Sequence, residues 1–230
     1  MALTTLPTAA LANDAVDNTK LNLADNYAFT GTVTGASDFE KITETVLTSD
    51  ASSVEFTSAG TPNIFDTKYR KLCFHFTNIR GIAGSSSNYN LRFNVSIDGG
   101  TNYNIAKTST YFLAYHSEAG AGAALSYEAS YDLANSTSDA NLQVIIGDDT
   151  DEANGCQFWL EQPHSSTIKK AYYCIGSTMT GNNTYNYFNA TSGYCQTTSA
   201  INAIRFIVYQ GGGSTNGVSD GSIISVYGVK

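Results

Sequence analysis

The sequence predicts an all-β fold, an antiparallel β-sandwich or jelly roll preceded by an extended N-terminal arm. Short runs of alternating apolar and polar residues recur along the chain, turn sequences rich in Gly and Asn separate them, and only 3 of 230 residues are proline. Alternation with a period of two is typical of strands. Helical periodicity is almost absent, and no repeat of constant length indicates a solenoid. A sandwich of this length ordinarily forms one domain, so we expect one main domain.

The first forty residues differ from the rest of the chain. Residues 11–21 suffice for one short helix at most, and residues 27–35 form a β-prone stretch whose glycines limit its packing. Each buried apolar side chain would contribute about 1.5–2 kcal/mol, against about 1–2 kcal/mol of backbone entropy per ordered residue. We therefore expect residues 1–39 to form an anchoring arm, mobile in the isolated chain, and residues 40–230 to form the sandwich domain.

Two strands are indicated most clearly. Between residues 69 and 78, alternation separates two sets of side chains: Leu72, Phe74 and Phe76 on one face, and Lys71, Cys73, His75 and Thr77 on the other. Between residues 89 and 97, the expected inward set is Tyr89, Leu91, Phe93, Val95 and Ile97. The second strand runs into Asp98–Tyr103, whose two glycines can supply the positive φ that tight hairpin turns require.

Shorter β-rich runs predict six further strands. They are Thr110–Tyr115, Leu142–Ile146, Gln157–Glu161, Ala171–Ile175, Ala203–Tyr209 and Ser222–Val229. Asn154-Gly155 and Gly211-Gly212-Gly213 lie between runs, as turns do.

Charge and cysteine content exclude several classes of protein. With 12 basic and 20 acidic side chains the formal net charge is −8, so we exclude a nonspecific nucleic-acid binder. No stretch reaches the roughly 18 apolar residues of a membrane-spanning helix, and the N-terminus lacks the basic start of a secretion signal. The spacing of the four cysteines fits neither a zinc site nor a redox motif. Buried free thiols are the favoured interpretation, with one disulfide as the alternative.

Catalytic motifs are absent from the sequence. It contains no Gly-x-Ser-x-Gly, no phosphate-binding loop and no His-Glu-x-x-His. Gly120-Ala121-Gly122 begins like a dinucleotide loop, but Leu125 stands where the third glycine belongs. The three histidines, His75, His116 and His164, lie on separate segments. We expect a protein that is not an enzyme, with no catalytic, cofactor-binding or metal-binding residues.

The sharpest charged feature is the acidic segment Asp148–Glu152, which is followed by Asn154-Gly155. Calcium prefers several oxygen ligands from one loop, and three residues here have them: Asp149, Asp151 and Asn154. The EF-hand pattern fails, because neither its glycine nor its glutamate falls at the required position. Mutual repulsion favours a solvated acidic turn, and calcium binding remains the alternative.

Aromatic residues crowd one region. Its members are Tyr172, Tyr173, Tyr185, Tyr187, Phe188 and Tyr194. Tyrosine stacks on sugar faces and its hydroxyl bonds sugar hydroxyls, so a glycan-binding surface is one interpretation. The favoured one is ordinary strand packing, in which tyrosine is common. A glycan-cleaving enzyme would need paired carboxylates, and outside the acidic segment these are isolated, as at Glu118, Glu128 and Asp132.

The order of several pieces resembles a known family. They are an arm from Asn13-Asp14-Ala15-Val16 through Phe29–Ala36, Ser53–Phe56, Tyr69–Leu72, Leu91–Phe93, Asp98–Tyr103 and Ile223–Val229. In this order they resemble bacteriophage virion fibre or spike proteins with a C-terminal β-sandwich tip domain of the marine phage type. Each piece alone is only a strand or a turn, and together they span most of the chain.

The resemblance implies a non-enzymatic structural protein of the virion, assembled in the bacterial host cytoplasm. It implies a homotrimer, held to other virion proteins through the N-terminal arm, whose tip contacts the host surface and its glycans, with no nucleic-acid binding and no membrane insertion. Because no repetitive shaft precedes the sandwich, we expect a short tail or head fibre. A capsid decoration (cement) protein and a glycan-binding module remain the alternatives. The resemblance carries over no catalytic residues.

Overall fold

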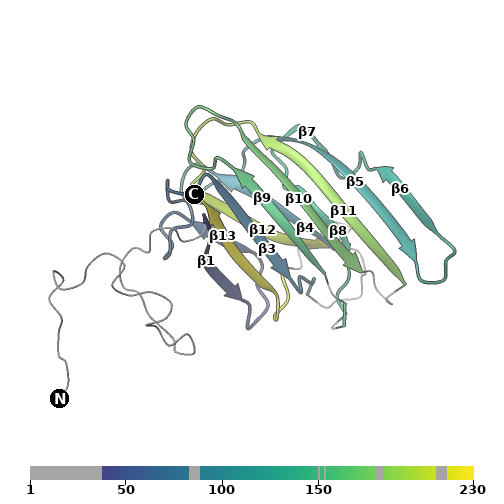
Figure 1. The fold of residues 1–230 in the computed structure, drawn as a ribbon. Coiled ribbons are helices and arrows are strands. Elements are labelled where there is room, and N and C mark those ends of the chain that lie inside the picture. Colours follow the sequence, from purple (N-terminus) through teal and green to yellow (C-terminus); the bar gives the residue numbers. More distant parts are fainter. Residues whose placement is uncertain (1–37, 83–88, 150, 153, 180–183, 211–216) are drawn as a thin grey trace, which may run out of the picture. The chain divides into compact units, whose positions relative to one another are not determined.

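The computed structural model describes residues 38–82, 89–149, 151–152, 154–179, 184–210 and 217–230 (Figure 1). Nearly all of the expected arm, residues 1–39, lies outside these ranges. The first described strand begins at Phe39, so the expected boundary between arm and sandwich falls within one residue of it.

The described residues form strands and no helix. The strands are β1 (Phe39–Val46), β2 (Val54–Thr57), β3 (Lys71–Thr77), β4 (Tyr89–Ser96), β5 (Lys107–Ser117), β6 (Ala123–Tyr127), β7 (Leu133–Ser136), β8 (Ala140–Ile146), β9 (Gly155–Glu161), β10 (Lys170–Met179), β11 (Tyr185–Cys195), β12 (Ala203–Gln210) and β13 (Ile223–Val229).

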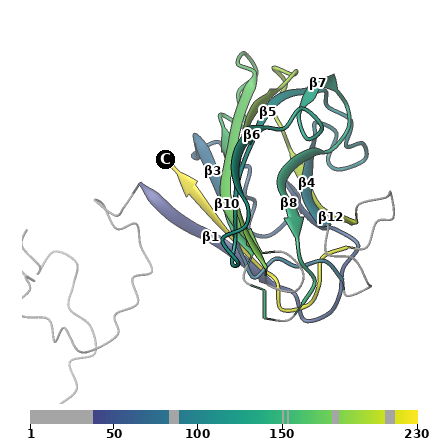
Figure 2. The same cartoon turned by 90° about the vertical axis from the view of Figure 1, so that its right-hand side faces the viewer.

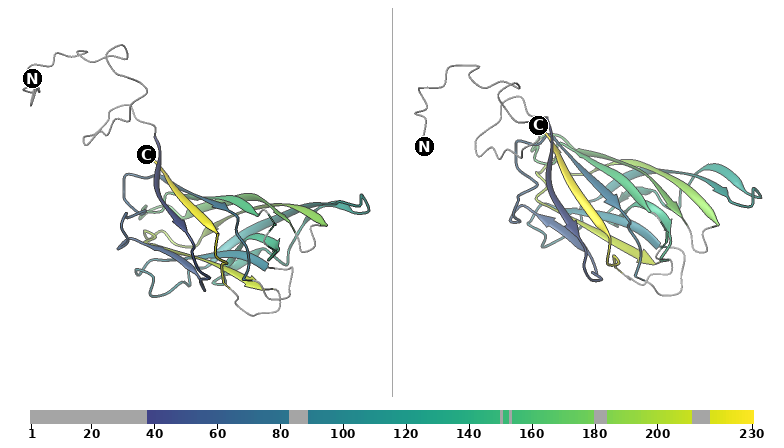
Figure 3. Two further views of the ribbon diagram at one scale, coloured as in Figure 1. Left: turned by 90° about the horizontal axis from the view of Figure 1, so that it is seen from below. Right: turned by 60° about the horizontal axis from the view of Figure 1, so that its bottom comes forward.

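These strands make two antiparallel sheets that lie face to face, and Figure 2 shows the two layers edge-on. The nine-stranded sheet has the order β1-β13-β3-β9-β10-β11-β5-β6, with β7 pairing to β5. The four-stranded sheet has the order β2-β12-β4-β8. The β5–β6 hairpin lies at the end of the larger sheet away from β1 (Figure 3). The prediction of an all-β sandwich is confirmed.

The core lies between the sheets, where alternation places the apolar side chains. The expected inward residues of β3 and β4 are at most 1% exposed, apart from Ile97. Aromatic rings interlock across the two layers: Phe206 lies 5.0 Å from Phe74 and 4.9 Å from Phe76, and Phe93 lies 4.6 Å from Phe158. Tilted and edge-on rings at these separations are favourable beyond the area they bury.

The Asp98–Tyr103 segment is a turn, but it is not the predicted hairpin turn, because it joins β4 of the four-stranded sheet to β5 of the nine-stranded sheet. Gly99 and Gly100 adopt φ of 76° and 93°, in the left-handed region that glycine enters without strain. The Asp98 carboxylate accepts hydrogen bonds from the Ser96 hydroxyl at 2.6 Å and from the Asn102 backbone N–H at 2.9 Å. These bonds stabilise the ionised form and lower the pKa of Asp98 to about 2.

The structure differs from the predictions in detail. Ile97, which was expected to point inward, is 40% exposed, because β4 ends at Ser96 and the chain enters the turn there. Asn90 and Asn94 alternate with the apolar side chains of β4 and are buried as well; Asn94 donates a hydrogen bond to the Thr137 carbonyl at 3.0 Å. Strands β1, β2, β6, β7 and β11 were not among the eight predicted strands.

The four cysteines are free and buried, which confirms the favoured interpretation of the thiols. Cys73, Cys156, Cys174 and Cys195 lie one each on β3, β9, β10 and β11, which are neighbours in the larger sheet. Burial raises the pKa of both Cys73 and Cys195 to about 12. These two thiols therefore stay protonated at neutral pH.

Candidate binding surface

The outer face of the nine-stranded sheet, turned away from the smaller sheet, collects exposed apolar side chains. Burial alternates along β10, where Tyr172 and Cys174 point inward and Tyr173 and Ile175 point outward. Directly paired residues of neighbouring strands point to the same side, so the register extends this division into inward and outward residues across the whole sheet. Nine of the eleven large hydrophobic residues exposed in the described chain lie on this face: Phe39, Val46, Phe112, Leu125, Tyr127, Tyr173, Ile175, Phe188 and Tyr194. An exposed face that gathers most of the exposed apolar side chains is a candidate interaction surface.

Leu125, Phe112 and Tyr127 form one end of this face, which we call the β5–β6 patch. Leu125 is 77% exposed, the largest fraction among these hydrophobic residues. Phe112 and Tyr127 are directly paired across β5 and β6, and their rings meet edge-on at 5.5 Å. The patch has no covering element among the described residues.

An aromatic row crosses the opposite half of the face. Phe39 stacks on Tyr227 at 4.9 Å and lies 6.1 Å from Trp159, which in turn stacks on Tyr173 at 6.1 Å. Cys73 pairs with both Tyr227 and Trp159, so these rings flank it and leave it 3% exposed. The row therefore covers an outward-pointing cysteine.

A shallow groove of about 640 Å³ lies beside the aromatic row, across β3, β9, β10 and β11. Its floor is low because Thr77, Gly155 and Ser177 are in register on three adjacent strands and carry small side chains or none. A Cβ on Gly155 would lie 2.9 Å from the backbone oxygen of Phe76, so the floor cannot rise there without backbone movement. Ile175 and Phe188 supply apolar lining.

Polar groups line the rest of the groove. His75 and Gln157 are directly paired across β3 and β9. Within the described chain, the side chains of His75, Thr77 and Gln157 are exposed and form no hydrogen bond. Ser177 accepts a hydrogen bond from Asn186 at 2.8 Å. The groove therefore offers unused donors and acceptors next to apolar surface.

The aromatic region predicted from sequence does not form one surface. Tyr172 is buried between the sheets, 4.8 Å from the Phe93 ring. Tyr173, Phe188 and Tyr194 lie on the outer face. Tyr185 and Tyr187 lie on the inner face of the same sheet, where both contact Tyr115 at ring separations of 6.0 and 5.5 Å. Packing between the two sheets explains the position of Tyr172. Alternation along the strands distributes the other five aromatic residues between the outer and inner faces of the larger sheet.

The acidic segment is not a fully solvated turn. Glu152 is 1% exposed, accepts a hydrogen bond from the Asp149 N–H at 3.0 Å, and covers Gly147 so closely that no Cβ would fit there. Burial, together with the charge of Asp149, raises the pKa of Glu152 to about 7. Asn154 accepts a hydrogen bond from the Met179 N–H at 2.7 Å. The described residues contain no group of three or more His, Cys, Asp or Glu side chains able to hold a metal ion.

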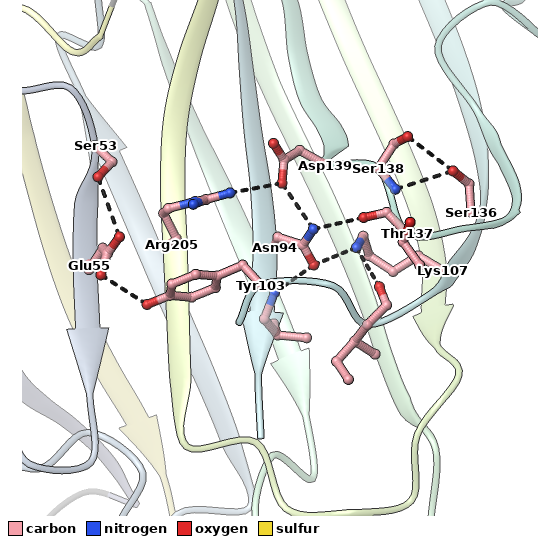
Figure 4. A network of polar contacts seen from close by, with 12 residues as sticks. Ser53, Glu55, Asn94, Tyr103, Lys107, Ser136, Thr137, Ser138, Asp139 and Arg205 are labelled. Carbon is pink, nitrogen blue, oxygen red and sulfur yellow. Dashed lines mark hydrogen bonds and ion pairs between the residues drawn. The ribbon is translucent and has the colours of Figure 1, made fainter. Parts of the chain in front are cut away.

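A network of polar contacts joins β2, β4 and β12 to the start of β5 (Figure 4). Lys107 is fully buried and donates hydrogen bonds to Asn94 Oδ1 at 2.7 Å and to the Ile105 carbonyl at 2.8 Å. Asn94 donates in turn to Asp139 at 2.9 Å, and Asp139 pairs with Arg205 at 3.5 Å. Burial lowers the pKa of Lys107 to about 8. Lys107 is inaccessible to a ligand because it is fully buried, so we assign this network a structural role.

The three histidines are not brought together. His75 lies on β3 and His116 on β5, with β9, β10 and β11 between them, and His164 lies in the connection after β9. They do not make a catalytic pair with one another.

Sequence reasoning missed most of the residues of this surface. Trp159 and Gln157 lie in the predicted strand Gln157–Glu161, but their outward positions on it were not recognised. Leu125 had been noted only as a mismatch to a glycine motif. Apolar residues at the outward positions of strands could have indicated this surface. They can be recognised in the sequence only after the inward positions have been assigned.

Comparisons with known proteins identify no relative: no family model, no curated protein and no solved structure matches this chain. Within the described ranges there is no helix long and apolar enough to cross a membrane.

Proposed function

We propose that the chain is a non-enzymatic structural protein of a bacteriophage virion, a short homotrimeric tail or head fibre or spike that contacts the host surface. The observation that carries the proposal is the gathering of exposed apolar side chains on the outer face of the nine-stranded sheet. Such a face is rarely left uncovered in a protein that works alone. The sequence pieces that resemble fibre proteins fall on β2, β3, β4 with its turn, and β13.

We assign the contact between protomers to the β5–β6 patch. Closed cyclic symmetry is the common solution for identical subunits, and a patch at one end of each sheet can meet its copies around an axis. Burial of Leu125, Phe112 and Tyr127 at such a contact supplies the apolar centre that stable interfaces have.

Sedimentation of the full chain tests this assembly. The expected mass is about three times the 24.5 kDa of one chain. The Leu125→Lys variant should sediment as a monomer, because a lysine charge cannot be buried there without a partner. Ile168→Lys is the matched control, since Ile168 is 53% exposed but lies outside the sheet. A wild-type monomer at micromolar concentration would contradict the proposed trimer.

Labelling of virions tests the location. An antibody raised against the sandwich domain should bind intact phage particles at a few positions, either at the tail or as separate fibres on the head. Even labelling over the whole capsid would instead identify a decoration protein. Absence of the chain from purified particles would overturn the proposal.

A further inference from the structure

We infer that the groove across β3, β9, β10 and β11 is a binding site for a neutral saccharide. This inference deepens the proposed function by naming the class of surface molecule bound. The biological role of this site rests on the proposed function, whereas the binding itself is inferred from the residues that line the groove.

None of the described residues that line the groove is Asp, Glu, Lys or Arg. The chain as a whole carries a net charge of −8, which disfavours sulfated, sialylated or uronic-acid glycans. A basic peptide would require carboxylates in the groove to pair with, and the lining offers hydroxyls, amides and one imidazole instead. An uncharged ligand with many hydroxyl groups fits this lining.

Strand register arranges the residues of the groove in a regular grid. Register places His75, Gln157 and Ile175 side by side on three strands, and Thr77, Gly155 and Ser177 in the parallel row two residues along. With strands about 4.8 Å apart and side chains of one face about 6.8 Å apart along a strand, this grid measures about 10 by 7 Å. That footprint suits one or two sugar rings.

The groove combines free hydrogen-bonding groups with apolar surface. His75, Thr77 and Gln157 can each bond a sugar hydroxyl without giving up a bond within the described protein. Phe188 pairs with Ser177 in register and is 49% exposed, so its ring borders the grid and can pack against the C–H face of a sugar. The volume of about 640 Å³ is within the range of small-molecule sites.

The test uses the full chain on an array of neutral and anionic glycans, followed by calorimetric titration with the neutral tetrasaccharides of glucose, mannose, galactose and N-acetylglucosamine. We expect neutral glycans to bind. Phe188→Ala should weaken binding about tenfold, as expected for loss of one stacking contact. Gln157→Ala should weaken it by a similar factor, through loss of hydrogen bonds.

Tyr194→Ala is the matched control for Phe188→Ala. Both are exposed aromatic residues on the outer face of β11, but Tyr194 lies outside the groove and outside the β5–β6 patch. It should leave the glycan affinity within twofold of wild type. Thermal unfolding of each variant verifies that it folds.

Several results would overturn the inference: no binding to any neutral glycan, preference for anionic glycans, or equal losses in Phe188→Ala and Tyr194→Ala. A Phe188→Ala variant that loses the trimer would also overturn it, because the groove would then hold a second copy of the chain. A wild-type monomer that binds neutral glycans would refute the proposed trimer and leave the groove assignment intact.

Discussion

Lys107 makes the stability of the sandwich depend on pH in the alkaline range. Its ammonium group is fully buried, and burial lowers its pKa from the ordinary value of 10.5 to about 8 in the folded protein. Between these pH values the unfolded chain keeps a proton at Lys107 that the folded chain has released. The free energy of unfolding therefore gains a contribution as pH rises from 8 to 10.5, amounting to about 3 kcal/mol at about 1.4 kcal/mol per pH unit.

The substitution Lys107→Met should remove this contribution. Methionine fills a similar volume, needs no solvation, and leaves Asn94 Oδ1 with the hydrogen bond that it accepts from the Val95 N–H at 2.9 Å. The Ile105 carbonyl loses its lysine partner, at a cost of about 1 kcal/mol. The variant should therefore be about as stable as wild type or more stable at pH 7, and its advantage should shrink by about 3 kcal/mol by pH 10.5.

Urea unfolding, monitored by the fluorescence of the single tryptophan, Trp159, measures this difference between pH 7 and 10.5. Wild type alone is not sufficient, because buried cysteines and tyrosines also titrate in the unfolded chain and change stability in the opposite direction. Subtracting wild type from variant at each pH cancels their effect. Lys169→Met serves as the control for removing one lysine charge, since Lys169 is exposed. A difference that does not change with pH would refute the reasoning.

Three further substitutions test other buried contacts. Glu152→Gln should flatten the dependence of stability on pH in the acid range. Since the pKa of Glu152 in the folded protein is raised to about 7, wild type should lose about 3 kcal/mol of stability as pH rises from 4.5 to 7. The midpoints of urea unfolding should show that the variant does not lose this stability. Gly228→Ala would bring a Cβ to 2.2 Å from the buried ring of Tyr69, so thermal unfolding should show a loss of about 1–3 kcal/mol that Tyr69→Leu partly restores. Asn189→Leu would leave the Val144 N–H, now bonded at 3.2 Å, unsatisfied in the core, and calorimetry should show a loss of about 2–3 kcal/mol. Wild-type behaviour in any of the three would show that the contact concerned does not act as described.

The sequence was sufficient for the fold class and for strands with one clean apolar face. Strand β4 was predicted almost to the residue because Tyr89, Leu91 and Phe93 alternate with Asn and Arg, and a Gly-Gly turn follows. Strand β11 was overlooked because aromatic residues occupy both of its faces, Tyr185 and Tyr187 on the inner one and Phe188 and Tyr194 on the outer one, so period two is not visible in its sequence. Its place became clear only from its pairing with β10 and β5.

The candidate site was less accessible to sequence reasoning for a related reason. The groove unites Thr77, Gly155 and Ser177, which lie far apart along the chain and meet only through register. Asn189 is similar: nothing local distinguishes it from other asparagines, yet it is completely buried and bonds Tyr111 at 2.6 Å. Aromatic crowding near Tyr185 suggested a surface, but alternation sent neighbouring rings to opposite sides of one sheet.

The distribution of the cysteines gives the protein a built-in set of reporters on how its larger sheet opens. Only a thiolate reacts with alkylating reagents, and each thiol is buried while its strand stays paired. Because β3, β9, β10 and β11 are consecutive neighbours and carry one cysteine each, pulsed alkylation followed by peptide mapping gives a rate for each of the four strands. Equal rates would mean that the sheet separates in one cooperative event, whereas a gradient from β3 to β11 would show the direction in which it frays.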